Sequence, residues 1–256
     1  MRRVIITGAS SGIGKALARH YAKTGATLGL IARRQGALEE IAAQLATPVR
    51  IYALDVRDSG ALRAAAADFL DRHGCPEIVI ANAGVSTGTL TEFPEDLAAF
   101  KDVLDINVVG MVNTFQPFIG AMRAAGRGSL VGIASVAGYR GLPGAAAYSA
   151  SKAAAISYLE SLRVELRASG IKVITLCPGY IATPMTALNP YRMPFMLSAE
   201  KAAVSIAGLI ERGNSLAVIP WQMAIVARVL HVLPNWLYDR LFGNAPRKPR
   251  TFSTKP

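Results

Sequence analysis

The chain has 256 residues, of which 52% are hydrophobic, and 28 basic residues against 17 acidic ones give a formal net charge of +11. This apolar content excludes general disorder, and the length suits one large domain or two small ones. Cys75 and Cys177 lie far apart and form no ligand motif, and the three histidines lack metal-binding spacing. We therefore expect a globular protein with free thiols and no metal site, as is typical of a reducing cytosol.

Residues 3–7 form a short apolar run that predicts a buried strand. The start of the chain, Met1-Arg2-Arg3 before Val4-Ile5-Ile6, superficially resembles an export signal, but the apolar stretch ends too soon for one. Gly8, Gly12 and Gly14 follow in a Gly-x-x-x-Gly-x-Gly pattern, and an amphipathic helix is predicted over 13–24. Strand, glycine loop and helix together place a pyrophosphate on a helix N-terminus. A glycine-rich turn without a ligand is the alternative.

The rest of the chain alternates between apolar runs and helical segments. Further strands are predicted at 27–32, 49–53, 77–81, 128–133, 171–176 and 216–219, and further helices at 36–46, 59–72, 95–125 with a break, 147–168 and 199–212. This alternation is typical of an α/β fold: a doubly wound parallel sheet of about seven strands with helices on both faces. We assign residues 1–220 to one nucleotide-binding and catalytic domain, and residues 221–256 to a C-terminal extension of the same domain.

Tyr148 and Lys152 stand four residues apart, and Tyr148 follows Ser135 by thirteen positions. An i, i+4 pair lies on one face of a helix, so a phenol can lie beside an ammonium. A tyrosine titrates near pH 10, and a nearby cation lowers that pKa, which makes the phenol a tunable general acid/base. An ordinary exposed Tyr/Lys pair is the alternative.

Taken in order, these motifs resemble the short-chain dehydrogenase/reductase family over roughly residues 1–220. The family's cofactor loop matches Thr7 to Gly14, its adenine contact matches Asp55-Val56, and its Asn-Ala-Gly turn matches Asn82-Ala83-Gly84. Its asparagine matches Asn107, its catalytic trio matches Ser135, Tyr148 and Lys152, and its nicotinamide segment matches Pro178-Gly179 and Thr183. The resemblance implies a Rossmann-type fold and hydride transfer between a nicotinamide cofactor and a carbonyl or alcohol.

The resemblance also implies a role for each catalytic residue. Tyr148 would give a proton to the carbonyl oxygen, and Ser135 would stabilise the charge developing on that oxygen. Lys152 would hold the cofactor ribose and tune Tyr148, and Asn107 would support Lys152 through a water-mediated path. Ser135 could instead only satisfy local backbone, and Asn107 could only cap its neighbours.

Arginine follows the second strand, where an enzyme that binds NAD usually carries Asp or Glu. Arg33 can stack on adenine and pair with a 2′-phosphate, and Arg34 adds charge, so we predict NADP(H). A solvated basic turn is the alternative. Some NADP-dependent relatives place a basic residue where this chain has Ser11. The predicted cofactor-binding residues are Gly8, Ser10, Ser11, Gly12, Ile13, Gly14, Arg33, Arg34, Asp55, Val56, Asn82, Ala83, Gly84, Tyr148, Lys152, Pro178, Gly179, Ile181 and Thr183.

Two segments bear on the substrate. Residues 183–198 are apolar and rich in methionine, which suits either an adaptable lid over a hydrophobic substrate or a loop packed on the core. Residues 221–242 predict two short amphipathic helices separated by Pro234, too short to span a bilayer. They could pack on the protein, cover the substrate or lie in a membrane interface. The basic tail that follows, 247–256, is predicted to be disordered.

The positive charge has no accompanying nucleic-acid motif, so we expect no nucleic-acid partner. We expect a cytoplasmic enzyme, a dimer or tetramer, with peripheral contact at the inner membrane face through residues 221–256. A nucleotide-binding regulatory or scaffold protein without turnover is the alternative, and a sugar-nucleotide epimerase or dehydratase is a weaker one.

Overall fold

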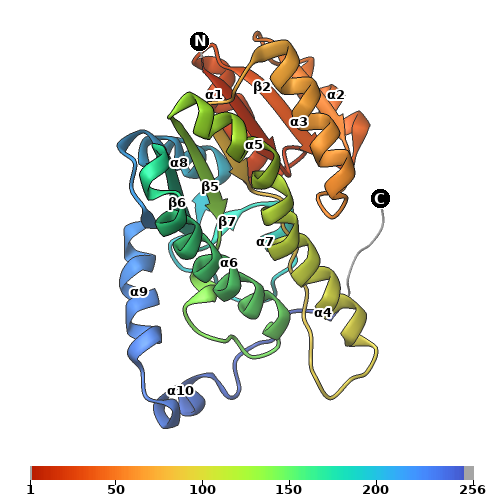
Figure 1. The fold of residues 1–256 in the computed structure, drawn as a ribbon. Coiled ribbons are helices and arrows are strands. Elements are labelled where there is room, and N and C mark those ends of the chain that lie inside the picture. Colours follow the sequence, from red (N-terminus) through yellow and green to blue (C-terminus); the bar gives the residue numbers. More distant parts are fainter. Residues whose placement is uncertain (1, 251–256) are drawn as a thin grey trace.

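A parallel sheet of seven strands forms the centre of the molecule, in a computed structural model that describes residues 2–250 (Figure 1). The strands lie in the order β3-β2-β1-β4-β5-β6-β9. Their bounds are β1 Arg3–Thr7, β2 Thr27–Ala32, β3 Val49–Ala53, β4 Ile78–Ala81, β5 Gly128–Ile133, β6 Ile171–Pro178 and β9 Leu216–Ile219. The predicted strands are confirmed, with β4 beginning one residue later and β6 ending two residues later than expected. They are continuous apolar runs because helices cover both faces of the sheet.

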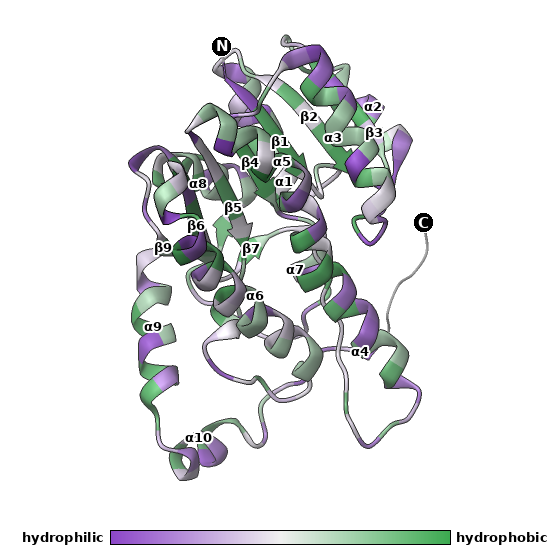
Figure 2. Cartoon of the chain, viewed as in Figure 1, coloured by the Kyte–Doolittle hydropathy of each residue, from purple (hydrophilic) through white to green (hydrophobic). Residues whose placement is uncertain are grey.

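Helices pack on both sides of the sheet and form two apolar cores. The first side carries α1 Gly12–Lys23, α2 Gln35–Ala42 and α8 Ala199–Arg212; the second carries α3 Ser59–His73, α5 Gly110–Ala125 and α6 Ala146–Glu165. Leu17, Leu38 and Ile206 are buried in the first core, and Phe69, Phe115 and Leu159 in the second. The strands are hydrophobic along the centre of Figure 2, whereas the helices alternate in hydropathy. The predicted doubly wound α/β fold is thereby confirmed.

The predicted break within residues 95–125 is a turn of π-helix. Helix α4 (Asp96–Leu104) leads directly into the π-helical turn Asp105–Val109, and α5 continues from Gly110. Such turns are rare and often lie at functional sites. Asn107 is buried in this turn, so the irregular backbone holds one of the predicted catalytic residues.

Short elements follow β6 and precede α8. Strand β7 (Ile181–Ala182) pairs in parallel with β8 (Leu197–Ser198), and α7 (Pro184–Ala187) lies between them. The side chain of Thr183 caps α7 by accepting a hydrogen bond from the backbone N–H of Thr186. The segment predicted as either lid or loop is therefore tied to the body at both ends.

The C-terminal extension contains the two expected helices, α9 Trp221–Val232 and α10 Asn235–Phe242. Residues 139–141 anchor both helices: the Tyr139 carbonyl lies 3.2 Å from His231 Nδ1, and Tyr238 donates to the Gly141 carbonyl at 2.5 Å. No helix in the described part of the chain is long and apolar enough to cross a membrane.

The expectation of a disordered tail is wrong for residues 247–250. From α10 the chain returns beneath α6 toward α4, as Figure 1 shows. Its carbonyl at Pro249 accepts a hydrogen bond from the Gly88 N–H at 2.8 Å, and Arg250 pairs with Glu95 and Asp96. The acidic partners that the tail itself lacks come from α4 and the residue before it. The remaining residues of the predicted tail, 251–256, lie outside the described residues.

Candidate active site

A cavity of about 670 Å³ opens at the carboxyl ends of the parallel strands, which is within the range of sites for small molecules and cofactors. It runs from the glycine loop after β1 to the first turns of α6. Every predicted catalytic or cofactor-binding residue lines it except Gly14 and Asn107. Parallel strands present their following loops at one edge of a sheet, which explains why segments far apart in sequence meet here.

The glycine loop has the backbone that a phosphate cradle requires. Gly8 and Gly12 have φ values of +66° and +53°, which side-chain-bearing residues rarely adopt. Gly14 lies behind the loop, where an added Cβ would come within 2.3 Å of the Gly8 carbonyl oxygen. Helix α1 begins at Gly12, so its N-terminal N–H groups face the cavity edge where an anion would be stabilised.

Asn82 and Thr7 fasten this loop to the turn after β4. The side-chain amide of Asn82 donates to the carbonyls of Thr7 and Gly8 at 2.9 and 3.3 Å. The Thr7 hydroxyl accepts from the backbone N–H groups of Asn82 and Ala83, both at 3.1 Å. The loop is thus preorganised, and the backbone donors at its helix end remain directed toward the cavity.

Arg33 and Arg34 lie at the end of β2, exposed at the rim of the same cavity. Arg34 Nη2 donates to the Ser10 hydroxyl at 3.2 Å, which draws this guanidinium toward the glycine loop. Neither arginine takes part in an ion pair among residues 2–250. Two guanidinium groups beside a phosphate-type loop can therefore accept an additional phosphate.

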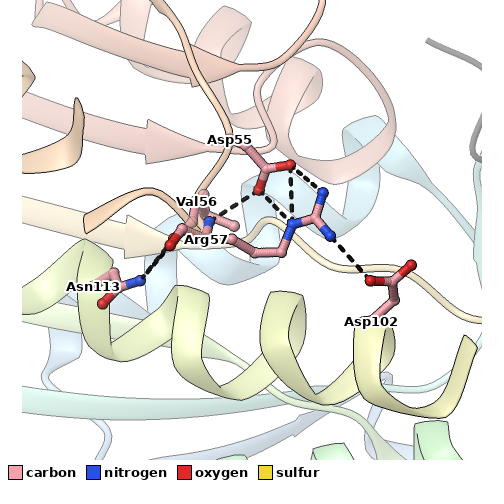
Figure 3. Close-up of polar contacts among 5 residues, drawn as sticks. All are labelled: Asp55, Val56, Arg57, Asp102 and Asn113. Carbon is pink, nitrogen blue, oxygen red and sulfur yellow. Dashed lines mark hydrogen bonds and ion pairs between the residues drawn. The ribbon is translucent and has the colours of Figure 1, made fainter. Parts of the chain in front are cut away.

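The Asp55-Val56 turn is held in place by side chains outside the cavity (Figure 3). Arg57 pairs with Asp55 at 2.8 Å and with Asp102 of α4 at 3.0 Å, and the Asn113 amide donates to the Val56 carbonyl at 3.0 Å. Partial burial favours a raised pKa for Asp55, but the hydrogen bonds and charge of Arg57 outweigh it and lower that pKa. The carboxylate stays ionised and fixed at the cavity wall.

Ser135, Tyr148 and Lys152 converge at the other end of the cavity. Ser135 follows β5, and its hydroxyl accepts a hydrogen bond from the Ala137 N–H at 3.1 Å. Tyr148 and Lys152 lie on the first two turns of α6, with Lys152 Nζ 5.8 Å from the centre of the tyrosine ring. Lys152 is only 4% exposed, and its ammonium donates to the Ile133 carbonyl at 2.8 Å. The predicted i, i+4 geometry is present.

The acid–base balance differs from the expectation that the nearby ammonium lowers the pKa of Tyr148. Burial raises that pKa, and a hydrogen bond with Ser135 opposes the rise. Burial also lowers the pKa of Lys152 to about 8, because a desolvated ammonium is costly. The pair therefore consists of a protonated phenol beside an ammonium that loses its proton more readily than an exposed lysine.

Asn107 lies behind the cavity and connects three segments. Its Oδ1 accepts from the Val85 N–H at 2.8 Å, and its Nδ2 donates to the Val85 carbonyl at 3.0 Å and to the Ser151 hydroxyl at 2.9 Å. Ser151 in turn donates to the Tyr148 carbonyl at 2.7 Å. Asn107 thus supports the helix that carries Tyr148 and Lys152, which is the capping role that the sequence left open.

The sequence missed several residues of this site. Ser151 links Asn107 to Tyr148, and its place three residues after the tyrosine, on the adjoining part of the helix surface, was an available signal. Lys248 also approaches Tyr148, with its Nζ 6.0 Å from the ring centre. No local pattern around Lys248 indicates this position.

The segment 183–198 lies partly over the cavity. Met185 and Thr186 of α7 line it, whereas Leu188, Phe195 and Met196 are about half exposed or more. The part of the segment that lines the cavity is therefore mixed, with two threonines, Pro184 and Met185, and its most apolar side chains point elsewhere or to solvent.

Comparison with known proteins identifies the family. A profile described as short chain dehydrogenase matches residues 2–192. An uncharacterized oxidoreductase of Myxococcus xanthus is 37% identical over 93% of this chain and 95% of its own. The chain belongs to the short-chain dehydrogenase/reductase family of oxidoreductases.

Solved structures agree with this assignment. An alcohol dehydrogenase from Thermococcus sibiricus in complex with 5-hydroxy-NADP superimposes with a TM-score of 0.77 at 26% identity, covering 86% of this chain and 96% of that one. A short chain dehydrogenase from Mycobacterium paratuberculosis bound to NAD gives 0.75 at 26% identity, covering 85% and 95%. Structural neighbours thus bind nicotinamide cofactors of both kinds.

Proposed function

We propose that the protein is an NADP(H)-dependent oxidoreductase that interconverts a carbonyl and a secondary alcohol on a largely hydrophobic substrate. The observation that carries the proposal is the convergence of Ser135, Tyr148 and Lys152 at one end of a cavity whose other end is a preorganised glycine loop. A dinucleotide extends across such a crevice from the helix N-terminus toward the next strands.

Reduction requires a hydride at the carbonyl carbon and a proton at its oxygen, and a bound nicotinamide supplies the hydride. Tyr148 gives the proton, for which its raised pKa is suitable because the phenol is held protonated until charge develops on the substrate oxygen. Ser135 donates a hydrogen bond to that oxygen. Lys152 would hold the ribose of the bound cofactor and stabilise the phenolate that remains, and solvent would restore the proton.

Arg33 and Arg34 are the basis for proposing NADP(H) rather than NAD(H). Both line the cavity, and neither is neutralised by an ion pair among the described residues. A 2′-phosphate adjacent to the end of β2 would meet two guanidinium groups. An acidic residue, which would repel that phosphate, is absent from both positions.

Replacing Tyr148 by Phe tests the proposal. Wild type and variant are compared on a panel of carbonyl compounds graded by chain length and ring size. For every compound that wild type reduces, turnover by the variant should be at least about 10²–10³-fold lower, while NADPH still quenches protein fluorescence. Unchanged biological activity of Tyr148→Phe would instead favour a binding protein that regulates or scaffolds without turnover. Activity on sugar nucleotides would favour an epimerase or dehydratase.

We also propose a peripheral membrane contact through α9 and α10. Trp221, Ile225, Val229 and Val232 recur at helical spacing on α9 and are at least half exposed, as is Trp236 on α10. Residues 221–250 contain five basic residues and one acidic one, which suits an anionic lipid surface. Sedimentation with anionic vesicles tests this contact, and a protein that stays in solution with both anionic and zwitterionic vesicles argues against it.

The remaining proposals concern location and assembly. We place the protein in the cytoplasm at the inner membrane face, and we propose a dimer or tetramer formed through α4, α5 and α6. Leu97 on α4, Val109 before α5 and Val164 on α6 are exposed apolar side chains on these elements. Light scattering after size exclusion measures the oligomeric state directly, and a monomer would overturn the assembly.

A further inference from the structure

Residues 243–250, here called the strap, follow α10 and run past the segment that precedes α6. The strap passes along Gly144, where an added Cβ would meet the Arg247 side chain at 2.8 Å, and then along Gly88. Beyond Gly88 the guanidinium of Arg250 lies 3.6 Å from the centre of the Phe93 ring and hydrogen bonds to Asp96 at 2.9 Å. The second half of the strap is therefore held against the body of the protein.

This anchoring brings Lys248 to the predicted proton donor. Lys248 Nζ donates to the Ser86 hydroxyl at 2.9 Å and lies 6.0 Å from the centre of the Tyr148 ring. Lys152 Nζ lies 5.8 Å from the same centre. Two ammonium groups, one from α6 and one from the strap, thus lie near the ring of Tyr148.

Lys248 has no carboxylate partner in the part of the chain that the structure describes. Residues 2–250 contain ten ion pairs, and none of them includes Lys248. Burial lowers the pKa of this lysine to about 8, so its surroundings disfavour the charge that it still carries at neutral pH. A partly buried cation is costly unless an anion accompanies it. The neutral hydroxyl of Ser86 does not meet that requirement.

Apolar side chains also line the cavity, among them Val85, Ile181 and Met185. Lys248 does not line the cavity itself, but it lies beside Tyr148, which does, and bonds to Ser86, which directly follows Val85. A ligand held against Tyr148 would therefore have an apolar wall and an ammonium group within reach, which favours a ligand with two parts. An apolar chain suits the apolar wall, and an anionic oxygen group suits Lys248.

We propose that Lys248 is the anion-binding residue of the substrate site, and that the preferred substrate is an apolar carbonyl compound bearing a carboxylate or phosphate. The inference rests on the proposed function for the identity of the carbonyl, but the anion site itself is open to a test without turnover. Lys248 is a specificity residue, because it faces the substrate's anionic group rather than the reacting carbon.

The test is a titration of the protein saturated with NADPH, using three unreactive probes of equal chain length: octanoate, octyl phosphate and octanol. Wild type should bind at least one of the two anions more tightly than octanol, and the stronger of the two identifies the anionic group. In Lys248→Met the preference for that anion over octanol should fall about 10–100-fold, as for the loss of a charge-assisted hydrogen bond. Lys248→Arg should retain most of it.

The control is Lys23→Met, an exposed lysine at the end of α1, which should leave the preference unchanged. A wild type that binds octanol as tightly as both anions overturns the proposal. So does a Lys248→Met variant in which affinity for all three probes falls equally, because that result assigns Lys248 a structural role only.

The same variants separate this inference from the proposed function. Reduction of 2-oxooctanoate and of its methyl ester gives a ratio of kcat/KM values, which Lys248→Met should lower through KM. If wild type reduces neither compound nor any other carbonyl, the proposed function fails while the probe titration still decides the anion site.

Discussion

The two ends of the cavity are held together in different ways. The cofactor end consists of turns that directly follow strands, so sheet pairing fixes Gly8, Arg33 and Asn82 relative to one another. At the substrate end, Tyr148 is also approached by the strap, which pairs with no described strand and is fastened by Arg250, by one backbone hydrogen bond at Gly88 and by the Lys248–Ser86 hydrogen bond. The comparison indicates that the cofactor end is rigid, whereas the strap at the substrate end can change in sequence or position with little effect on the stability of the fold.

Lys152 lies at the substrate end beside Tyr148 and is also proposed to hold the cofactor, so its replacement has the largest expected effect. Lys152→Met should lower kcat/KM about 10²–10⁴-fold and also weaken NADPH binding about tenfold, because under the proposed function the ammonium would contact both the phenol and the ribose. Tyr148→Phe should reduce only turnover. Fluorescence titration with NADPH and steady-state rates distinguish the two, and equal NADPH affinity in both variants would contradict the shared position of Lys152.

Arg33→Asp tests the cofactor end alone. A carboxylate beside the 2′-phosphate should weaken NADPH binding about 10–100-fold, while NADH binding stays constant or improves and the KM for the carbonyl changes little. Arg63→Asp, an exposed arginine on α3, makes the same change in net charge and should alter neither affinity. Dissociation constants for both cofactors give the answer, and a parallel loss for NADPH and NADH would argue against a phosphate contact.

Arg250→Met tests the substrate end alone. Loss of its contacts with Phe93, Glu95 and Asp96 should release the strap and raise the KM for the carbonyl about 3–10-fold, with NADPH affinity unchanged. Trypsin should cleave after Arg247 faster than in wild type. The matched control is Arg240→Met on α10, which should change neither the KM for the carbonyl nor the cleavage by trypsin. A lower affinity for NADPH in Arg250→Met would show that the two ends are not independent.

Glu77 lies at the opposite edge of the sheet from both ends and should give the smallest effect. It accepts a hydrogen bond from the Arg3 N–H at 2.7 Å and pairs with the Arg3 guanidinium. Partial burial favours a raised pKa for Glu77, but the Arg3 contacts outweigh it and lower that pKa. Glu77→Gln should reduce the free energy of unfolding by about 1 kcal/mol at pH 7 and leave both affinities intact.

The pH dependence of that difference has a defined sign. A carboxylate with a lowered folded-state pKa stabilises the protein above its unfolded pKa of about 4.3, and the contribution is lost as pH falls through the folded value. The difference in unfolding free energy between wild type and Glu77→Gln should therefore narrow as pH falls below about 4.3. Urea unfolding at several pH values measures it, and a gap that widens in acid would contradict the pairing with Arg3.

The sequence predicted the cofactor end well because its signals are local. Buried parallel strands are continuous apolar runs, and the turns after them carry the glycines, Arg33, Asp55 and Asn82. The break that became the π-helical turn was also expected. The ion pair between Asp55 and Arg57 was not predicted, although the two residues are only two positions apart.

The substrate end was harder to predict because its contacts span the chain. Lys248 and Ser86 are 162 positions apart, and the tail alone offers no acidic partner that would suggest order. The i, i+4 spacing placed Lys152 beside Tyr148 correctly. It could not report that desolvation, rather than the charge of Lys152, sets the direction of the Tyr148 pKa.

Transfer of deuterium tests the central claim most directly. Wild-type protein is incubated with NADPH that carries deuterium at C4 of the nicotinamide, together with a carbonyl from the panel, and the alcohol is analysed by mass spectrometry. We predict an alcohol with deuterium on the carbinol carbon, and none above background with Tyr148→Phe. Tight NADPH binding with no labelled alcohol from any carbonyl, or equal labelling by both proteins, would contradict the account.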